Sequence, residues 1–166
     1  RCIVFDAKIE TAKQLKAADS RFHIAASVSH EYDIERYNDC VGGTLHTVAE
    51  VIARKDLFDW AWLDEWDLAG RNGGTKTLYD KETLAALRSE GISIALVTPE
   101  LHASSPGLLG GEAHQDAENV GRLAARIKEI AFLNPDLMCT DYPDQLLEFL
   151  TGKVSEITIK SSTGIL

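Results

Sequence analysis

The sequence is poor in basic side chains. Its 166 residues include 17 lysines and arginines against 26 aspartates and glutamates, which gives a formal net charge of −9. Nucleic-acid binding depends on lysine and arginine neutralising phosphates, so this balance argues against a nucleic-acid partner. No apolar run approaches the roughly 20 residues of a membrane-spanning helix, and we expect no membrane span. The first residues also lack the charged-then-apolar form of a secretory signal peptide.

Cysteine is scarce as well. Cys2, Cys40 and Cys139 are odd in number and far apart, so they predict neither a disulfide framework nor a zinc site. This usage favours a reducing compartment, and we expect a cytoplasmic protein. Cys2 and Cys139 lie inside apolar runs, which predicts that they are small buried hydrophobic residues.

Several catalytic motifs are missing. The chain has no G-x-G-x-x-G turn, no P-loop and no G-x-S-x-G elbow, and its histidines lack the His-x-x-x-His spacing of a transition-metal site. What it has instead is a regular succession of short apolar runs and amphipathic segments. The runs predict strands at 2–6, 22–28, 57–63, 92–97 and 137–140. Helices are predicted at 8–18, 44–53, 81–89, 116–133 and 145–150.

Strands that alternate with helices predict a parallel α/β fold. An open doubly wound sheet usually carries a glycine-rich first turn, which is missing here, so we favour a (β/α)₈ barrel. A whole barrel needs roughly 250 residues, and five βα units fit its C-terminal portion. Arg1 runs straight into an apolar strand, so we expect the first units to lie upstream. Residues 1–150 would form this partial barrel, and 151–166 a tail with the alternation of a short edge strand.

Every predicted strand ends in acid. The acids are Asp6, Glu31, the group Asp64, Glu65 and Asp67, and then Glu100 and Asp141. In a barrel these ends converge, and two like charges about 4 Å apart repel by about 4 kcal/mol in a protein-like dielectric. A divalent cation, Mg²⁺ or Ca²⁺, would relieve the repulsion because both take oxygen ligands. From position alone we expect Asp64 and Glu65 to be metal ligands, with Lys8 and Arg71 as competing counter-ions.

Histidines and tryptophans supply further candidates. His30, His102 and His114 follow strands and are possible acids or bases, whereas His23 in a strand and His46 on a helix are expected to be structural.

The three tryptophans are spaced by two or four residues. Trp60 and Trp62 share one face of a strand and are expected to pack against helices. Trp66 lies beyond the strand end and is a candidate to line a pocket.

Three stretches together resemble a known family. Residues 134–144 read N-P-D-L-M-C-T-D-Y-P-D, similar to the last strand, G-V-D-G-I-I-T-D-Y-P-D, of the glycerophosphodiester phosphodiesterases. These are (β/α)₈ barrels related to phosphatidylinositol-specific phospholipase C. Residues 91–100 are similar to the preceding strand, with Val97 and Glu100 in place of Trp and Asn. Residues 5–8, F-D-A-K, are similar to I-E-I-K, with Asp6 in place of Glu.

The resemblance covers about residues 2–150 as barrel units four to eight, and it implies metal-dependent hydrolysis of a phosphodiester in lipid metabolism. Asp6 would be a metal ligand, and Lys8 a phosphate or glycerol contact. Glu100 would be a polar contact at the barrel mouth, and His102 with the 101–116 loop would form a lid. The family's catalytic histidine pair belongs to earlier strands, so the resemblance places no catalytic residue in this chain and implies that the chain alone is inactive.

Two other readings fit the same residues. An acidic barrel mouth is equally typical of a metal-dependent lyase or aldolase acting on a sugar phosphate. The departures at Val97 and Glu100 favour, more weakly, a barrel-derived binding domain without chemistry.

Overall fold

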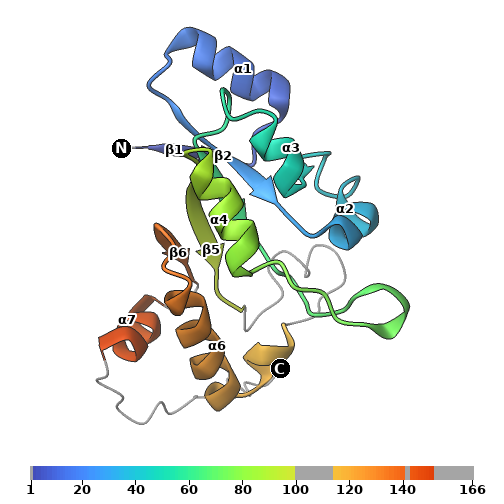
Figure 1. Ribbon diagram of the computed structural model, residues 1–166, viewed down its shortest axis with the longest axis vertical. Helices are drawn as coiled ribbons and strands as arrows, with labels where there is room; N and C mark the ends of the chain where they lie inside the picture. The colour runs from blue at the N-terminus through green and yellow to red at the C-terminus, as the bar shows by residue number, and fades with distance from the viewer. Residues whose placement is uncertain (1, 100–113, 141–142, 152–166) are drawn as a thin grey trace, which may run out of the picture.

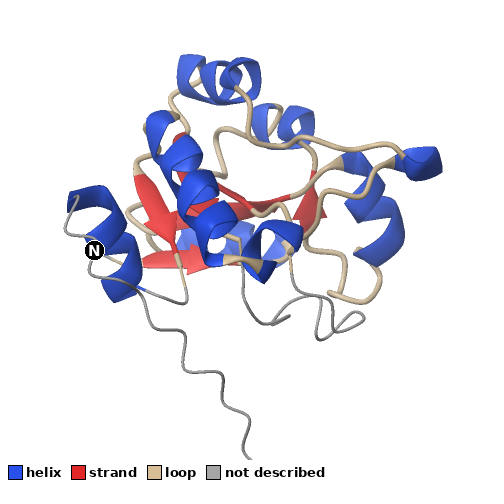
Figure 2. Cartoon of the chain, turned by 90° about the horizontal axis from the view of Figure 1, so that it is seen from below, coloured by secondary structure: helices blue, strands red, loops and turns tan. Residues whose placement is uncertain are grey.

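The computed structural model describes residues 2–99, 114–140 and 143–151. Parallel strands form one sheet, curled into a half-barrel with helices on its outer face (Figure 1 and Figure 2). The strands are β1 (Ile3–Phe5), β2 (His23–Val28), β3 (Leu45–His46), β4 (Trp60–Leu63), β5 (Ser93–Val97) and β6 (Leu137–Cys139). The α-helices are α1 (Ile9–Ala18), α2 (Glu31–Tyr37), α3 (Val48–Ile52), α4 (Lys81–Ser89), α6 (Val120–Phe132) and α7 (Pro143–Thr151). Two 3₁₀ turns complete the set, η1 (Arg71–Gly73) and η2 (Gln115–Glu118).

The sheet has the order β1-β2-β4-β5-β6, with β3 paired to β2, and every strand pair is parallel. All five predicted apolar runs form strands, and the predicted α/β partial barrel is confirmed. Parallel strands connected by helices all end at the same edge of the sheet, which places the segments that follow them side by side. No helix within the described residues has the length and apolar character that would take it across a bilayer.

The main hydrophobic core lies between the outer face of the sheet and the helices. Alternate strand residues such as Ile24, Leu63 and Ile94 are fully buried there, as the period of two along a strand requires. Helices close this layer with side chains such as Val51 of α3 and Leu87 of α4. This layer explains the apolar spacing of α3 and α4, whereas Leu123 and Ile127 of α6 form a second cluster with Leu146 of α7.

The tryptophans of β4 lie on the opposite, concave face of the sheet. Ala61 and Leu63 belong to the core under the helices, so Trp60 and Trp62, which alternate with them, point the other way. The prediction that these two rings pack against helices is wrong, because period two alone does not say which face a set of residues takes. The ring centroid of Trp62 lies 4.5 Å from that of Phe5 on β1.

The segment 44–53 is a strand followed by a helix rather than one helix. Leu45 and His46 pair with β2, and α3 begins only after Thr47. Thr47 and Glu50 form a capping box, in which each side chain bonds the backbone N–H of the other residue. His46 lies on this strand rather than on a helix, and it is buried with its ring centroid 5.3 Å from that of Phe58.

One side of β2 is shared by two strands. β1 pairs along its first half, as far as Phe5 opposite Ala25, and β3 pairs along its second half from Leu45 opposite Ser27. The chain must therefore leave β2 after Phe5. Asp6 makes this turn with φ 56°, a left-handed conformation that Asp tolerates better than most residues.

The remaining helix ends follow the sequence closely. Asp80 caps α4 by accepting from Thr83 N, and Gly91 stops it with φ 75°, both as predicted. The long helix predicted at 116–133 is divided: η2 precedes α6, which Asn119 caps. Cys2 is exposed rather than buried, Cys139 is half-buried, and most of the predicted 151–166 tail lies outside the described residues.

The core predicts that two phenylalanines contribute very differently to the free energy of unfolding. Phe58 is 1% exposed and Phe132 is 85% exposed. Phe58→Ala should lower the free energy of unfolding by about 3–5 kcal/mol, since it empties a packed site. The matched Phe132→Ala should change it by less than about 0.5 kcal/mol. Urea denaturation of both variants measures the two values, and equal losses would contradict this core.

Candidate functional site

The predicted site residues that follow β1 and β4 lie at the carboxyl edge of the sheet. Asp6 and Lys8, which follow β1, are both exposed, and Lys8 lies beside Gly42. Asp64 and Glu65 follow β4, which lies inside the sheet between β2 and β5. The fold therefore brings these four residues to one edge, as the sequence predicts, but it gives them different surroundings.

Asp64 stands toward the concave side of this edge. It continues the alternation of Trp60 and Trp62, its backbone N–H donates to Val28 O at 3.1 Å, and the residue is half-buried. Burial raises the pKa of the Cys139 thiol to about 12, and the negative charge of Asp64 adds to that rise. The charge of Asp64 is therefore felt at β6. A thiol with this pKa stays protonated and is a poor nucleophile at neutral pH.

Asp6 and Asp64 are offset along the strands. Phe5 is aligned through Ala25 with Trp60, so Asp64 lies about three residues further along than Asp6. With strands about 4.8 Å apart and a rise of about 3.3 Å per residue, the two are roughly 10 Å apart in each direction. Two direct ligands of one ion must lie closer than this, because metal–oxygen distances are only about 2.0–2.6 Å.

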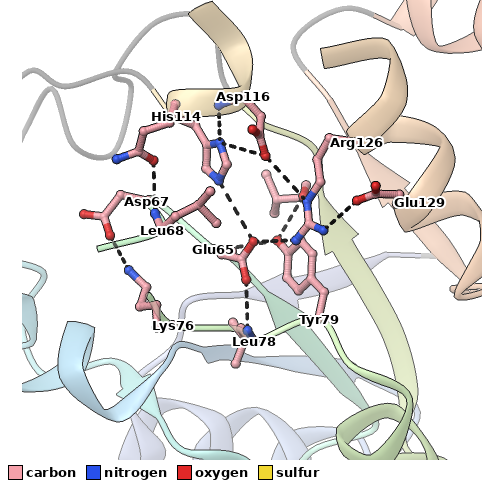
Figure 3. A network of polar contacts seen from close by, with 12 residues as sticks. Glu65, Asp67, Leu68, Lys76, Leu78, Tyr79, His114, Asp116, Arg126 and Glu129 are labelled. Atoms are coloured by element: carbon pink, nitrogen blue, oxygen red, sulfur yellow. Dashed lines mark hydrogen bonds and ion pairs between the residues drawn. The ribbon is translucent and has the colours of Figure 1, made fainter. Parts of the chain in front are cut away.

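Glu65 is buried in a network of protein donors (Figure 3). Its Oε1 accepts from Arg126 Nη2 at 2.6 Å, and its Oε2 accepts from Leu78 N at 2.9 Å. Arg126 also donates to Glu129 at 3.1 Å and comes from α6, so one ion pair joins the segment after β4 to a helix 61 residues later. Removing Arg126 would leave the buried carboxylate of Glu65 without its counter-ion.

Tyr79 lies under the same network and links the ends of two strands. Its hydroxyl accepts from Glu65 N at 3.0 Å and is placed to donate to Leu63 O at 3.0 Å and Val97 O at 2.9 Å. Burial, with added repulsion from Asp64 and Glu65, holds the pKa of Tyr79 well above its ordinary value. The phenol therefore stays neutral and fixes the backbone.

His114 is a buried neutral imidazole next to Glu65. Its Nδ1 accepts from Asp116 N at 3.1 Å, so the neutral ring carries its proton on Nε2, which lies 4.0 Å from Glu65 Oε1. Burial lowers the pKa of His114, although Glu65 and Asp116 oppose this shift. At 4.0 Å the Nε2–H contact is longer than a hydrogen bond, so it is electrostatic.

A second buried network balances the remaining acid after β4. The Lys76 ammonium, with its side chain 1% exposed, bonds Asp33 at 2.8 Å and also bonds Asp67. Arg36 completes the tetrad by pairing with both carboxylates. Burial opposes ionisation of Asp67, but the hydrogen bond and charge of Lys76 outweigh it and hold the pKa of Asp67 below its ordinary value.

The counter-ions differ from those expected from the sequence. Arg126, Lys76 and Arg36 neutralise the acids, whereas Arg71 pairs with Glu35 at the surface. Arg126 was visible as a charge on the apolar stripe of its helix, since it lies three residues after Leu123. Lys76 had no such signal, because it sits in a glycine-rich loop that folds back on the sheet.

The remaining predicted site residues fall into two groups. Trp66 is 7% exposed and packs against Tyr37 at a centroid distance of 5.3 Å, and its role in substrate binding stays a prediction. Glu100 and His102 lie outside the described residues. Across those residues no three His, Cys, Asp or Glu side chains gather in a way that suits a metal ion, so Asp6 and Asp64 supply suitable oxygens but not a complete ligand set.

Loss of Lys76 should be costly. Lys76→Met leaves the buried carboxylate of Asp33 and the largely buried one of Asp67 with Arg36 alone, and we expect the free energy of unfolding to fall by about 3 kcal/mol. Lys128→Met, on the exposed side of α6, should change it by less than about 0.5 kcal/mol. Chemical denaturation tests this pair, and a loss below about 1 kcal/mol for Lys76→Met would show that the tetrad is not a stabilising unit.

Stability should also depend on pH through His114. The unfolded histidine titrates near pH 6.5, and burial gives the folded one a lower pKa. The folded state is thus fully favoured above about pH 6.5 and loses stability as pH falls toward the folded pKa, because the unfolded chain takes up the proton first. His114→Gln should flatten this decline by up to about 1.4 kcal/mol per pH unit. His23→Gln, at a half-exposed position, is the matched control, and equal slopes for the two variants would contradict the assignment.

A scan against family models found no match to this chain, and a search of curated proteins found none either. The resemblance to the glycerophosphodiester phosphodiesterases therefore stays a prediction from three stretches of sequence.

Proposed function

We propose that this chain forms the C-terminal part of a metal-dependent phosphodiester hydrolase that acts on glycerophosphodiesters. The observation that carries the proposal is the position of Asp64, directly after a strand that lies inside the sheet, partly exposed and on the concave side of the carboxyl edge. Active sites of (β/α)₈ barrels lie at this edge. The three stretches of family resemblance add to it, since each includes the end of one of these strands.

In this proposal each residue at the edge has its own role in binding the metal or the substrate. Asp64 is the direct ligand of a hard divalent cation, Mg²⁺ or Ca²⁺, which when bound neutralises phosphate oxygens and orients a nucleophile. Lys8 offers its ammonium to the phosphate from the end of β1. The offset between the strands makes Asp6 a more distant group, which would reach the ion through water or the substrate.

Glu65 has a supporting role in this scheme. Both of its oxygens already accept hydrogen bonds, from Arg126 and from Leu78 N. To serve as the metal ligand predicted from the sequence, it would have to give up its hydrogen bonds from Arg126 and from Leu78 N, and Arg126 would keep only its exposed partner Glu129 and the more distant Asp116. Glu65 instead holds the segment that carries Asp64.

General acid and base are not assigned to the described histidines. His114 is 3% exposed, and His30 accepts from Tyr32 N through Nδ1 as the cap of α2. The proposal therefore places the acid and the base outside these residues, and it expects this chain alone to be without activity.

A second candidate is a binding domain without chemistry. The observation that favours it is the charge balance after β4, where protein cations rather than an ion neutralise Glu65 and Asp67. The two candidates differ in one property, because only the hydrolase requires a divalent cation at Asp64.

Metal titration of the chain separates the two candidates. We expect calorimetry to detect binding of Mg²⁺ or Ca²⁺. Asp64→Asn should weaken the affinity about tenfold, which is a loss of about 1.4 kcal/mol of binding free energy. Asp6→Asn should weaken it less, because Asp6 is not a direct ligand. Glu129→Gln, an exposed acid on α6, should leave it unchanged.

Two results would count against the hydrolase. Absence of saturable metal binding would favour the binding domain. Equal affinities for Asp64→Asn and Glu129→Gln would remove Asp64 from the site, whatever the metal does elsewhere on the chain.

A further inference from the structure

The two peptide groups on either side of Asp64 are held by one side chain. Tyr79 Oη accepts from Glu65 N at 3.0 Å, and it lies 3.0 Å from Leu63 O, to which it is placed to donate. These atoms belong to the residues directly after and directly before Asp64. The N–H of Asp64 itself donates to Val28 O of β2 at 3.1 Å. The backbone at Asp64 is therefore fixed by one bond to β2 and by two contacts with a phenol.

The ring of Tyr79 has little freedom to move. The residue is 6% exposed and belongs to the main hydrophobic core. Leu78 N, one residue earlier, donates to Glu65 Oε2 at 2.9 Å, and Asp80, one residue later, caps α4. The guanidinium carbon of Arg126 lies 5.7 Å from the ring centroid (Figure 3). The phenol is thus held through both of its neighbours in the chain and from one face of its ring.

A fixed backbone matters most for a residue that has to place a charge. Aspartate has a short side chain with few rotamers, so the position of the Asp64 carboxylate follows closely from its backbone. Metal–oxygen distances of about 2.0–2.6 Å leave little tolerance, and groups that are ordered beforehand lose less conformational freedom when a ligand binds. A restraint on the backbone at Asp64 is therefore a restraint on the geometry of the proposed metal site.

A purely structural role for the phenol is the alternative. Two of its contacts would serve that role equally well, because Leu63 O and Val97 O are the ends of the adjacent strands β4 and β5. The third contact does not join strands. Glu65 N lies beyond the last residue of β4, on the far side of Asp64. This bond fixes the segment after the strand, which is the segment that carries Asp64.

We propose that Tyr79 is a positioning residue, whose hydroxyl holds Asp64 in the place from which it binds a divalent cation. The inference rests on the proposed function, because it takes Asp64 as the metal ligand. In this role the phenol acts through the backbone of Asp64 rather than by contact with the metal.

The variant Tyr79→Phe removes the hydroxyl and keeps the ring. We expect the affinity of the folded chain for Mg²⁺ or Ca²⁺, measured by calorimetry, to fall about threefold to fivefold. This loss is smaller than that for Asp64→Asn, because the carboxylate is still present. The thermal midpoint should fall by about 3–8 °C, since the N–H of Glu65 loses its acceptor.

Ile130→Val is the matched control for stability. It removes one methylene from a fully buried side chain of α6 and should lower the thermal midpoint by about 2–5 °C. Because it leaves the hydroxyl of Tyr79 in place, the metal affinity should stay unchanged. A loss of stability alone therefore does not imitate the effect expected of Tyr79→Phe.

Hydrogen exchange reports the same contact in the wild-type chain. Without metal, the Glu65 amide should be protected about as well as the amides of β4, because its acceptor is buried. Saturating metal should slow its exchange further, since opening of this contact would release the metal ligand. In Tyr79→Phe the Glu65 amide should exchange at least about tenfold faster relative to the amides of β4.

The outcomes separate this inference from the proposed function. Absence of metal binding by the wild-type chain would remove both. Metal binding that Asp64→Asn weakens and Tyr79→Phe leaves unchanged would overturn the inference alone, and so would equal weakening by Tyr79→Phe and Ile130→Val. If Tyr79→Phe does not fold, the wild-type chain decides, because rapid exchange of the Glu65 amide, or exchange that bound metal does not slow, would also overturn the inference.

Discussion

The neutralisation of buried acids by buried cations is the constraint on which the carboxyl edge of this molecule depends. Glu65 and Asp67 follow a central strand and are held against the sheet, and each would be costly there without a partner. Arg126 and Lys76 meet them from a later helix and from a loop. Lys76 is buried and Arg126 is largely buried, so each acid positions its cation as much as the cation positions the acid.

This constraint connects the fold to the proposed chemistry. The networks fix the segment around Asp64, whereas Asp64 itself remains partly exposed on the concave side. Neighbouring acids thus have different surroundings: Glu65 is buried among protein donors, and Asp64 is half-buried at the edge of the sheet. A barrel scaffold commonly combines rigid strand ends with variable loops in this way, which lets one architecture serve many reactions.

The sequence was informative wherever one local rule dominated. Short apolar runs predicted five of the six strands, and Asp80 and Gly91 marked both ends of α4. It failed where a tertiary contact decided the outcome. Leu45 and His46 fit a helical stripe yet pair with β2, because the second half of that strand offers a free side once β1 has ended. The partner of Glu65 lies 61 residues away, a distance at which no periodicity in the sequence can identify it.

The phenol of Tyr79 has a consequence for the shape of the half-barrel. Neighbouring parallel strands can separate beyond their last backbone hydrogen bond. Here the hydroxyl oxygen of Tyr79 bridges the last carbonyls of β4 and β5. The Tyr79 side chain thereby links the two strands at the point where their backbone hydrogen bonds end. The separation of these two strand ends is accordingly limited by two contacts to one oxygen, and loss of that hydroxyl would remove the restraint.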